Sequence, residues 1–156
     1  MTLRPLLLLD VDGVLNPFPE LPDGFVEIDL FPEDEEPARL AAIHGDWLRE
    51  LADAYDLAWA TGWGEEANRL LCPFFGLPEL PLVPLPSMPF EPRHKVPAVA
   101  AFAAERPAAW VDDMLGPEAL AWAAARIEPT LLIDIDSATG LARANVDRLL
   151  AWAGEL

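Results

Sequence analysis

Short, continuous apolar runs alternate with segments of helical periodicity along most of this chain. The first run is 6–9, four consecutive leucines that end at Asp10, and such a run is typical of a strand covered on both faces. Strands of this kind belong to parallel sheets, in which each connection crosses over through a helix. The alternation therefore predicts an α/β chain with helices on both faces of one parallel sheet.

The pattern predicts five strands, at 6–10, 56–61, 80–83, 108–111 and 130–134. It predicts helices at 38–55, 62–71, 97–106, 117–126 and 141–152. Pro81 assigns the 80–83 strand to an edge of the sheet, because proline has no N–H for a second neighbour. These segments predict a Rossmann-like, doubly wound sheet of five parallel strands. Open sheets of this kind bind ligands at the carboxyl ends of their strands.

Two proline-rich stretches, 16–37 and 72–97, interrupt this alternation. In the first, the turn signal at 22–24 and the alternating arm at 25–31 predict a small hairpin flap after the first strand. Acidic residues crowd the same stretch, and we interpret it as a solvated loop. The second stretch predicts a stiff, extended connection. Because neither stretch is long enough to fold separately, we expect a single domain over 1–156.

The composition narrows the possible partners. Ten Lys and Arg residues against 27 Asp and Glu residues give a formal charge of −17. Broad electrostatic binding to nucleic acid or to an anionic membrane surface is therefore not expected, and an anion-binding site would need a local cation. The single cysteine, Cys72, excludes an intrachain disulfide and a multi-cysteine zinc site. The lack of a long apolar segment predicts a cytoplasmic protein with no membrane partner.

The most informative motif is Asp10-Val-Asp12-Gly13, directly after the first apolar run. Two carboxylates two residues apart at a strand end face the same way, and Gly13 allows a sharp turn. Like charges this close are costly unless a cation lies between them or one of them is protonated. A calcium-binding loop is the alternative, but its later acids and its terminal glutamate are missing here.

At this point the sequence resembles the haloacid dehalogenase superfamily of aspartate-nucleophile phosphatases. The first motif of that family, an apolar strand and Asp-x-Asp-Gly-[Val/Thr], matches 10–14. The second, a Thr or Ser that ends an apolar strand, matches Thr61, and the third, a Lys at a helix start, matches Lys95, the only lysine in the chain. The fourth, an acidic pair after an apolar strand, matches Asp112 and Asp113. The resemblance covers nearly the whole chain.

The resemblance implies a phosphatase that works through an aspartyl phosphate. Asp10 would be the nucleophile, and Asp12 would protonate the leaving oxygen and then deprotonate the attacking water. Mg²⁺ would be held by the Asp10 carboxylate, the Asp12 backbone carbonyl and an acid of the fourth motif. Asp113 is the first choice for that acid, and Asp112 would orient it.

The other two motifs would supply contacts to the phosphoryl group. Thr61 would donate its hydroxyl and Gly62 its backbone N–H to the phosphoryl oxygens, while Lys95 would offset the negative charge of Asp10 and the phosphate. From this role we expect that Lys95→Met lowers turnover with little loss of fold stability. Trp63, Arg69 and Arg93 are further candidates for contact with the substrate.

The substrate itself is expected to be phosphorylated and large or exposed. Family members that select small metabolites carry a cap domain in one of two places, and here only about 20-odd residues are available in either, so the resemblance implies an open, uncapped site. The sequence at 10–17 and 60–63 also resembles that of a branch of the family that includes a domain associated with RNA-repair proteins. The strong negative charge argues against nucleic acid unless a partner contributes the contact.

Two other interpretations are open at the level of the sequence. A receiver-type phosphoacceptor domain has a similar sheet with paired acids, Thr and Lys, but there the phosphorylated Asp ends the third strand and the Lys follows the fifth. A member of the same family could also keep the fold and Mg²⁺ while serving as a catalytically silent interaction domain. Turnover of a generic aryl phosphate would separate this second interpretation from an enzyme.

Overall fold

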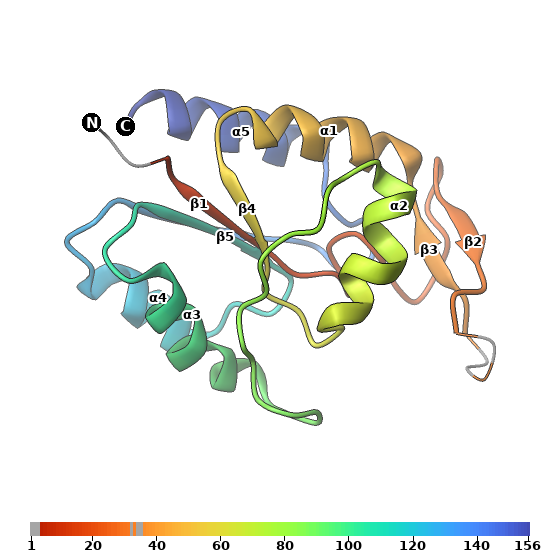
Figure 1. Cartoon of the computed structure of the whole chain (residues 1–156), viewed down its shortest axis with the longest axis horizontal. Coiled ribbons are helices and arrows are strands. Elements are labelled where there is room, and N and C mark those ends of the chain that lie inside the picture. Colours follow the sequence, from red (N-terminus) through yellow and green to blue (C-terminus); the bar gives the residue numbers. More distant parts are fainter. Residues whose placement is uncertain (1–3, 32, 34–35) are drawn as a thin grey trace.

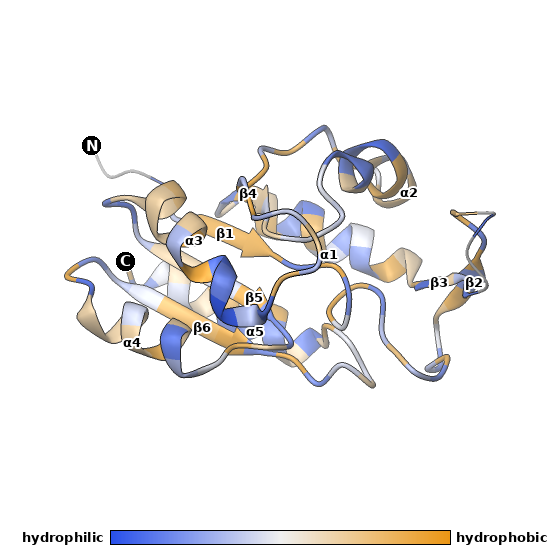
Figure 2. Ribbon diagram, turned by 90° about the horizontal axis from the view of Figure 1, so that it is seen from below, coloured by the Kyte–Doolittle hydropathy of each residue, from blue (hydrophilic) through white to orange (hydrophobic). Residues whose placement is uncertain are grey.

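A computed structural model describes residues 4–31, 33 and 36–156, so part of the predicted acidic loop lies outside the described residues. Its centre is a parallel sheet in the order β4-β1-β5-β6 (Figures 1 and 2). The strands are β1 (Leu6–Leu9), β4 (Asp56–Trp59), β5 (Ala108–Asp112) and β6 (Thr130–Asp134). The predicted α/β class and its parallel sheet are therefore confirmed.

The prediction of a fifth strand at 80–83 is wrong for the described chain. This segment makes only an isolated parallel bridge, in which Trp59 pairs with Leu82. Two backbone hydrogen bonds hold it, from the Trp59 N–H to the Pro81 carbonyl and from the Val83 N–H to the Trp59 carbonyl. Pro81 and Pro84 have no N–H to donate, so the ladder ends after one bridge.

Helices cover both faces of the sheet, with α1 (Ala42–Ala52) and α5 (Arg143–Gly154) on one and α3 (Lys95–Ala103) and α4 (Pro117–Ala125) on the other (Figures 1 and 2). Among the described residues, no helix combines the length and the apolar character needed to cross a membrane.

The four leucines of β1 serve both layers, because successive side chains of a strand point to opposite faces. Leu7 and Leu9 belong to the core that contains Leu48 of α1 and Leu149 of α5. The alternate residues of β1 belong to the core built on the other two helices, whose members include Leu6, Leu8, Val99, Ala103 and Ala119. A strand buried on both faces needs a continuous apolar run, which is what the sequence has at 6–9.

Two shorter helical segments lie between β4 and α3 in the sequence. The helix predicted at 62–71 continues through a π-helical turn, η1 (Ala67–Leu71), into α2 (Cys72–Phe75). It ends at Gly76, whose φ of 68° is the left-handed conformation common after a helix. A single 3₁₀ turn, η2 (Pro92–His94), leads directly into α3, so that helix begins two residues before the predicted start.

The helix predicted at 38–55 begins later than expected, because its first residues form a strand. Ala38–Leu40 (β3) pairs antiparallel with Val26–Ile28 (β2) in a separate two-stranded sheet (Figure 1). Ala38 and Leu40 are buried while Arg39 between them is less so, which is the alternation of a strand. Part of the predicted arm at 25–31 thus pairs with 38–40 and not across the predicted turn at 22–24, and its role as a flap stays a prediction.

A buried histidine joins this small sheet to the main fold. His44 in α1 lies between the rings of Phe25 and Trp47, each 5.3 Å away between ring centroids. Its Nε2 lies 2.8 Å from the Leu141 carbonyl and must donate to it, which leaves Nδ1 as the bare nitrogen. Nδ1 is buried without a partner among the described residues, and burial lowers the pKa of His44 below its ordinary 6.5.

This arrangement predicts a loss of stability in mild acid. Because the pKa of His44 is lower in the folded chain than in the unfolded one, the unfolded state binds more protons as the pH falls through 6.5. The free energy of unfolding, measured in urea from about pH 8 to about pH 5, should therefore fall more steeply in the wild type than in His44→Gln, which keeps an N–H donor. His94→Gln, at the exposed histidine, is the matched control and should follow the wild type. Parallel curves for the wild type and His44→Gln would contradict this prediction.

Candidate functional site

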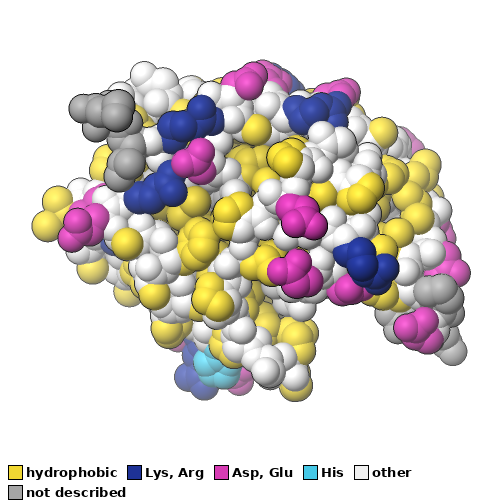
Figure 3. Space-filling model, in the orientation of Figure 1, with side chains coloured by type: hydrophobic (Ala, Val, Ile, Leu, Met, Phe, Trp, Pro, Cys, Tyr) yellow, Lys and Arg dark blue, Asp and Glu magenta, His cyan; other side chains and the backbone are white. Residues whose placement is uncertain are grey.

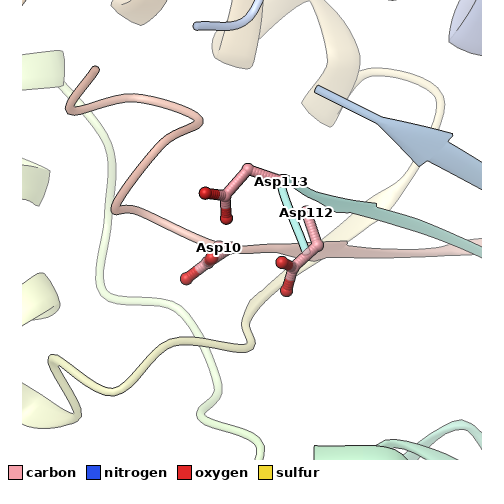
Figure 4. A group of neighbouring side chains, drawn as sticks. All are labelled: Asp10, Asp112 and Asp113. Atoms are coloured by element: carbon pink, nitrogen blue, oxygen red, sulfur yellow. The ribbon is translucent and has the colours of Figure 1, made fainter. Parts of the chain in front are cut away.

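Three aspartates meet at the carboxyl edge of the sheet. Asp10 follows β1, Asp112 ends β5 and Asp113 comes next. Since β1 and β5 are parallel neighbours with Leu9 opposite Val111, these residues are brought side by side. One carboxylate oxygen from each lies within 4.8 Å of the other two (Figure 4). Asp10 and Asp112 are buried and Asp113 is half-buried.

Gly13 makes the close approach of the two loops possible. Its φ is 82°, and a Cβ at this position would overlap the Asp113 carboxylate. The position therefore needs glycine both for the backbone conformation and for space. This explains physically why the Asp-x-Asp-Gly turn and the acidic pair belong to one site.

Lys95, the first residue of α3, places its ammonium among the carboxylates. Its Nζ donates to Asp112 Oδ2 at 2.8 Å and to the Ala60 carbonyl at 3.0 Å, and lies 3.3 Å from Asp10 Oδ1. The Lys95 side chain is only 9% exposed. The lone lysine of the sequence is thus a buried cation, and it joins the ends of β1, β4 and β5.

The pKa values of this cluster reflect an excess of negative charge. Burial raises the pKa of Asp10 well above its ordinary 3.8, and the Asp112 charge adds to this, while Lys95 opposes it. Burial and the Asp112 charge also raise the pKa of Asp113, to about 6. Burial lowers the pKa of Lys95, but Asp10 and Asp112 raise it by more, so its net shift is upward. One ammonium does not offset three carboxylates here.

These observations fit a divalent metal ion. The three aspartates could hold one, since their oxygens converge and the Lys95 ammonium offsets only part of their charge. A ligand set of oxygen atoms alone suits a hard cation such as Mg²⁺ or Ca²⁺. Asp112 already accepts hydrogen bonds at both oxygens, from Lys95 and from the Met114 N–H, so Asp10 and Asp113 have more capacity left for a metal.

Asp12 lies apart from this group, and other residues hold its carboxylate. Its Oδ1 accepts hydrogen bonds from Asn16 Nδ2 and Trp63 Nε1, each at 3.0 Å. Trp63, predicted as a substrate contact, therefore also positions Asp12. Asn16 also accepts the Arg39 N–H at 2.7 Å, which ties this loop to β3. Asn16 had no predicted role, because a single Asn in a loop carries no periodic signal.

A cavity of about 370 Å³ opens over the cluster. Its lining includes Asp10, Asp12, Lys95, Asp112, Asp113, Gly62 and Trp63 together with Phe18, Met88, Phe90, Pro92 and Met114. A Cβ on Gly62 would lie 2.9 Å from Met88 Sδ, so the wall is closely packed at that point. Met88 and Phe90 belong to the proline-rich connection, and sequence reasoning missed them because the segment has no regular structure.

Three other predicted residues lie outside this cavity. Thr61 is buried just after β4, and its Oγ1 accepts the Trp63 N–H at 3.2 Å. Arg69 pairs with Glu66 and Arg93 pairs with Glu91, and both arginine side chains are more than half exposed. Figure 3 shows the same pattern on one face of the molecule, where basic side chains lie beside acidic ones. Neither arginine lines the cavity over the carboxylates, although Arg93 lines a neighbouring cavity together with Asp113.

Comparisons of this chain with protein-family models, with curated proteins and with solved structures found no match. What the site can do chemically is therefore inferred from its own residues. They amount to three converging carboxylates, one buried ammonium and a separately held fourth carboxylate around one cavity.

Proposed function

We propose that this protein is a Mg²⁺-dependent phosphatase that hydrolyses phosphomonoesters through an aspartyl phosphate on Asp10. The observation that carries the proposal is the contact of Lys95 with both Asp10 and Asp112 on a cavity that also contains Asp12 and Asp113. One small cavity then contains the nucleophile Asp10, the cation Lys95 and the acid–base group Asp12. It also contains Asp113, which with Asp10 could hold the metal. The resemblance to the haloacid dehalogenase superfamily supports the same assignment.

In the first step, an Asp10 carboxylate oxygen attacks phosphorus and the bond from phosphorus to the ester oxygen breaks. Asp12, in its protonated form, donates a proton to that leaving oxygen, so an alcohol is released. Asp10 is oriented for the attack because its Oδ1 accepts the Val11 N–H at 2.8 Å and faces Lys95. Asp12 is oriented by Asn16 and Trp63.

In the second step, Asp12 takes a proton from a water molecule as that water attacks the phosphorus of the aspartyl phosphate. The bond from phosphorus to the Asp10 oxygen breaks, which releases inorganic phosphate and restores the Asp10 carboxylate and protonated Asp12. Lys95 stays beside Asp10 throughout and offsets the charge that returns to this carboxylate. Gly62, which lines the cavity, would donate its backbone N–H to a phosphoryl oxygen.

The metal would be held by Asp10 and Asp113, with Asp112 between Lys95 and the Met114 N–H as support. When bound, Mg²⁺ would offset the charge of the phosphoryl oxygens and of the carboxylates together. Its binding would also offset the repulsion from Asp112 that, in addition to burial, raises the pKa values of Asp10 and Asp113.

The test is hydrolysis of para-nitrophenyl phosphate with Mg²⁺, with excess chelator and after Mg²⁺ is restored. We expect turnover that chelator abolishes and Mg²⁺ restores. Asp113→Asn should raise the Mg²⁺ concentration for half-maximal activity by about 10-fold or more, since it removes a charged ligand. Asp23→Asn, at an exposed turn, is the matched control and should not change it. Full activity in excess chelator, or no turnover under any condition, would exclude the proposed function.

A further inference from the structure

A second cavity lies beside the first and is larger, about 670 Å³ against about 370 Å³. The two share four lining residues, Asp12, Phe18, Gly62 and Trp63. The larger cavity is lined by none of the residues that surround the predicted phosphoryl position, namely Asp10, Lys95, Asp112 and Asp113. It is therefore a separate space that meets the carboxylate cavity along a common wall.

Asp12 lies at this common wall. The placement of the substrate relative to Asp12 rests on the proposed function. If Asp12 protonates the leaving oxygen, that oxygen lies between the two cavities. The phosphoryl group occupies the smaller cavity beside Asp10, so the rest of the substrate extends past Asp12 into the larger one. The Asn16 side chain bonds to both Asp12 and the Arg39 backbone, so it fixes the far wall relative to Asp12.

The walls of the larger cavity are rich in aromatic side chains. Phe18 and Phe31 come from the proline-rich stretch 16–37 and Trp63 follows β4, and the rings of Phe31 and Trp63 are in edge contact at 5.2 Å between centroids. Phe18 is 42% exposed although it is a large apolar residue. A further ring placed here would cover apolar surface and make edge or stacked contacts with these rings.

The charges around this cavity restrict what the leaving group can carry. Asp12, Glu36 and Glu66 all line it, and Glu66 is paired with Arg69 outside the cavity. Arg39 is the basic residue of the lining, and it forms no ion pair with the carboxylates that the structure describes. With Glu66 paired, the lining has no net positive charge that would attract a leaving group with several negative charges, whereas an uncharged ring needs none.

We propose that the larger cavity is a leaving-group subsite for phosphomonoesters whose alcohol carries an uncharged aromatic ring. The ring lies against Phe18, Phe31 and Trp63, and the ester oxygen lies at Asp12. Ring contacts made in this way increase kcat/KM for aromatic substrates, and they act independently of the groups that bind phosphate.

The experiment compares phenethyl phosphate with cyclohexylethyl phosphate as substrates of the full chain with Mg²⁺. The two esters have leaving alcohols of similar acidity and size, so they differ in aromaticity. We expect kcat/KM about 3- to 10-fold higher for the phenethyl ester. Calorimetric titration with the two corresponding phosphonates, which cannot be hydrolysed, should show the same order of affinity.

A pair of variants locates the preference. Phe31→Leu should bring the ratio of the kcat/KM values for the two substrates close to one, because Phe31 lines the larger cavity and not the smaller one. Phe102→Leu is the matched control and should keep the wild-type ratio, since Phe102 is in α3 and lines a cavity with Arg4 and Asp56 at the opposite end of the sheet. Inorganic phosphate serves as the probe of the phosphoryl position, and its inhibition constant should be the same in Phe31→Leu and Phe102→Leu.

The possible failures are distinguishable. If para-nitrophenyl phosphate is hydrolysed but the two esters react equally, or the two phosphonates bind equally, the subsite is overturned while the proposed function stands. If the ring preference is present but survives in Phe31→Leu, the ring binds elsewhere and the subsite is again overturned. If the chain hydrolyses none of these esters, the proposed function fails, and the leaving-group assignment fails with it.

Discussion

Asp10→Asn is expected to abolish turnover and, in the metal-free protein, to raise thermal stability. Turnover should fall by roughly 10⁴-fold or more, because the covalent step has no nucleophile left. Stability should rise because the pKa of Asp10 is raised in the folded chain, so its ionised form costs folding free energy. This cost is present once the pH exceeds the ordinary value of 3.8, and it grows as the pH rises towards the folded pKa.

Two measurements check this result. Rapid acid quenching with a radiolabelled aryl phosphate should trap a phosphoenzyme in the wild type and none in Asp10→Asn. Thermal melts in chelator should give a higher Tm for Asp10→Asn than for the wild type, whereas Asp23→Asn should change neither the phosphoenzyme nor the Tm. Retained phosphoenzyme in Asp10→Asn would place the nucleophile elsewhere. A lower Tm would mean that the Asp10 charge stabilises the fold.

Lys95→Met is expected to have the opposite effect on stability while also lowering activity. The methionine leaves Asp10 and Asp112 buried without their shared cation, and removing one partner of a buried ion pair costs about 3–5 kcal/mol. The sequence alone predicted little loss of stability, because methionine keeps much of the volume of the lysine stem. The burial of Lys95 between two carboxylates reverses that expectation. Turnover should fall by about 10²-fold or more.

Urea denaturation with and without Mg²⁺ checks this prediction. The loss of unfolding free energy in Lys95→Met should be largest in chelator and smaller with Mg²⁺, since the metal offsets part of the same charge. Arg148→Met removes an exposed cation from α5 and is the matched control, expected to stay close to the wild type. Lys95→Arg should recover only part of the activity, because a planar guanidinium replaces a compact ammonium. Wild-type stability and turnover in Lys95→Met would remove Lys95 from the site.

The placement of the acids could be predicted from the sequence because strand order and direction decide it. Residues that follow parallel strands reach the same edge, so Asp10 and Asp112 were expected to meet there. Lys95 could be placed at the same edge only through the resemblance to a known family. The structure brings all three together in contact.

Other features depend on contacts between segments far apart in the chain. The bonds of Asp12 to Asn16 and Trp63, and the cavity walls made by Phe31 and Met88, have no periodic signal in the sequence. Arg69 and Arg93 were plausible phosphate contacts by charge alone, but each has a glutamate close by in sequence and pairs with it at the surface.

The sequence by itself determined the α/β class, the double burial of β1 and the gathering of acidic residues at one sheet edge. Hydrophobic periodicity and the order of strands and helices can be followed along the chain, and together they imply parallel strands whose ends meet at one edge. Only the tertiary structure decided that 80–83 makes one bridge instead of a strand, that 38–40 pairs with β2 and that Lys95 is buried. Each of these outcomes depends on a backbone or charged group from a distant part of the sequence. Such groups come into contact only when the chain folds.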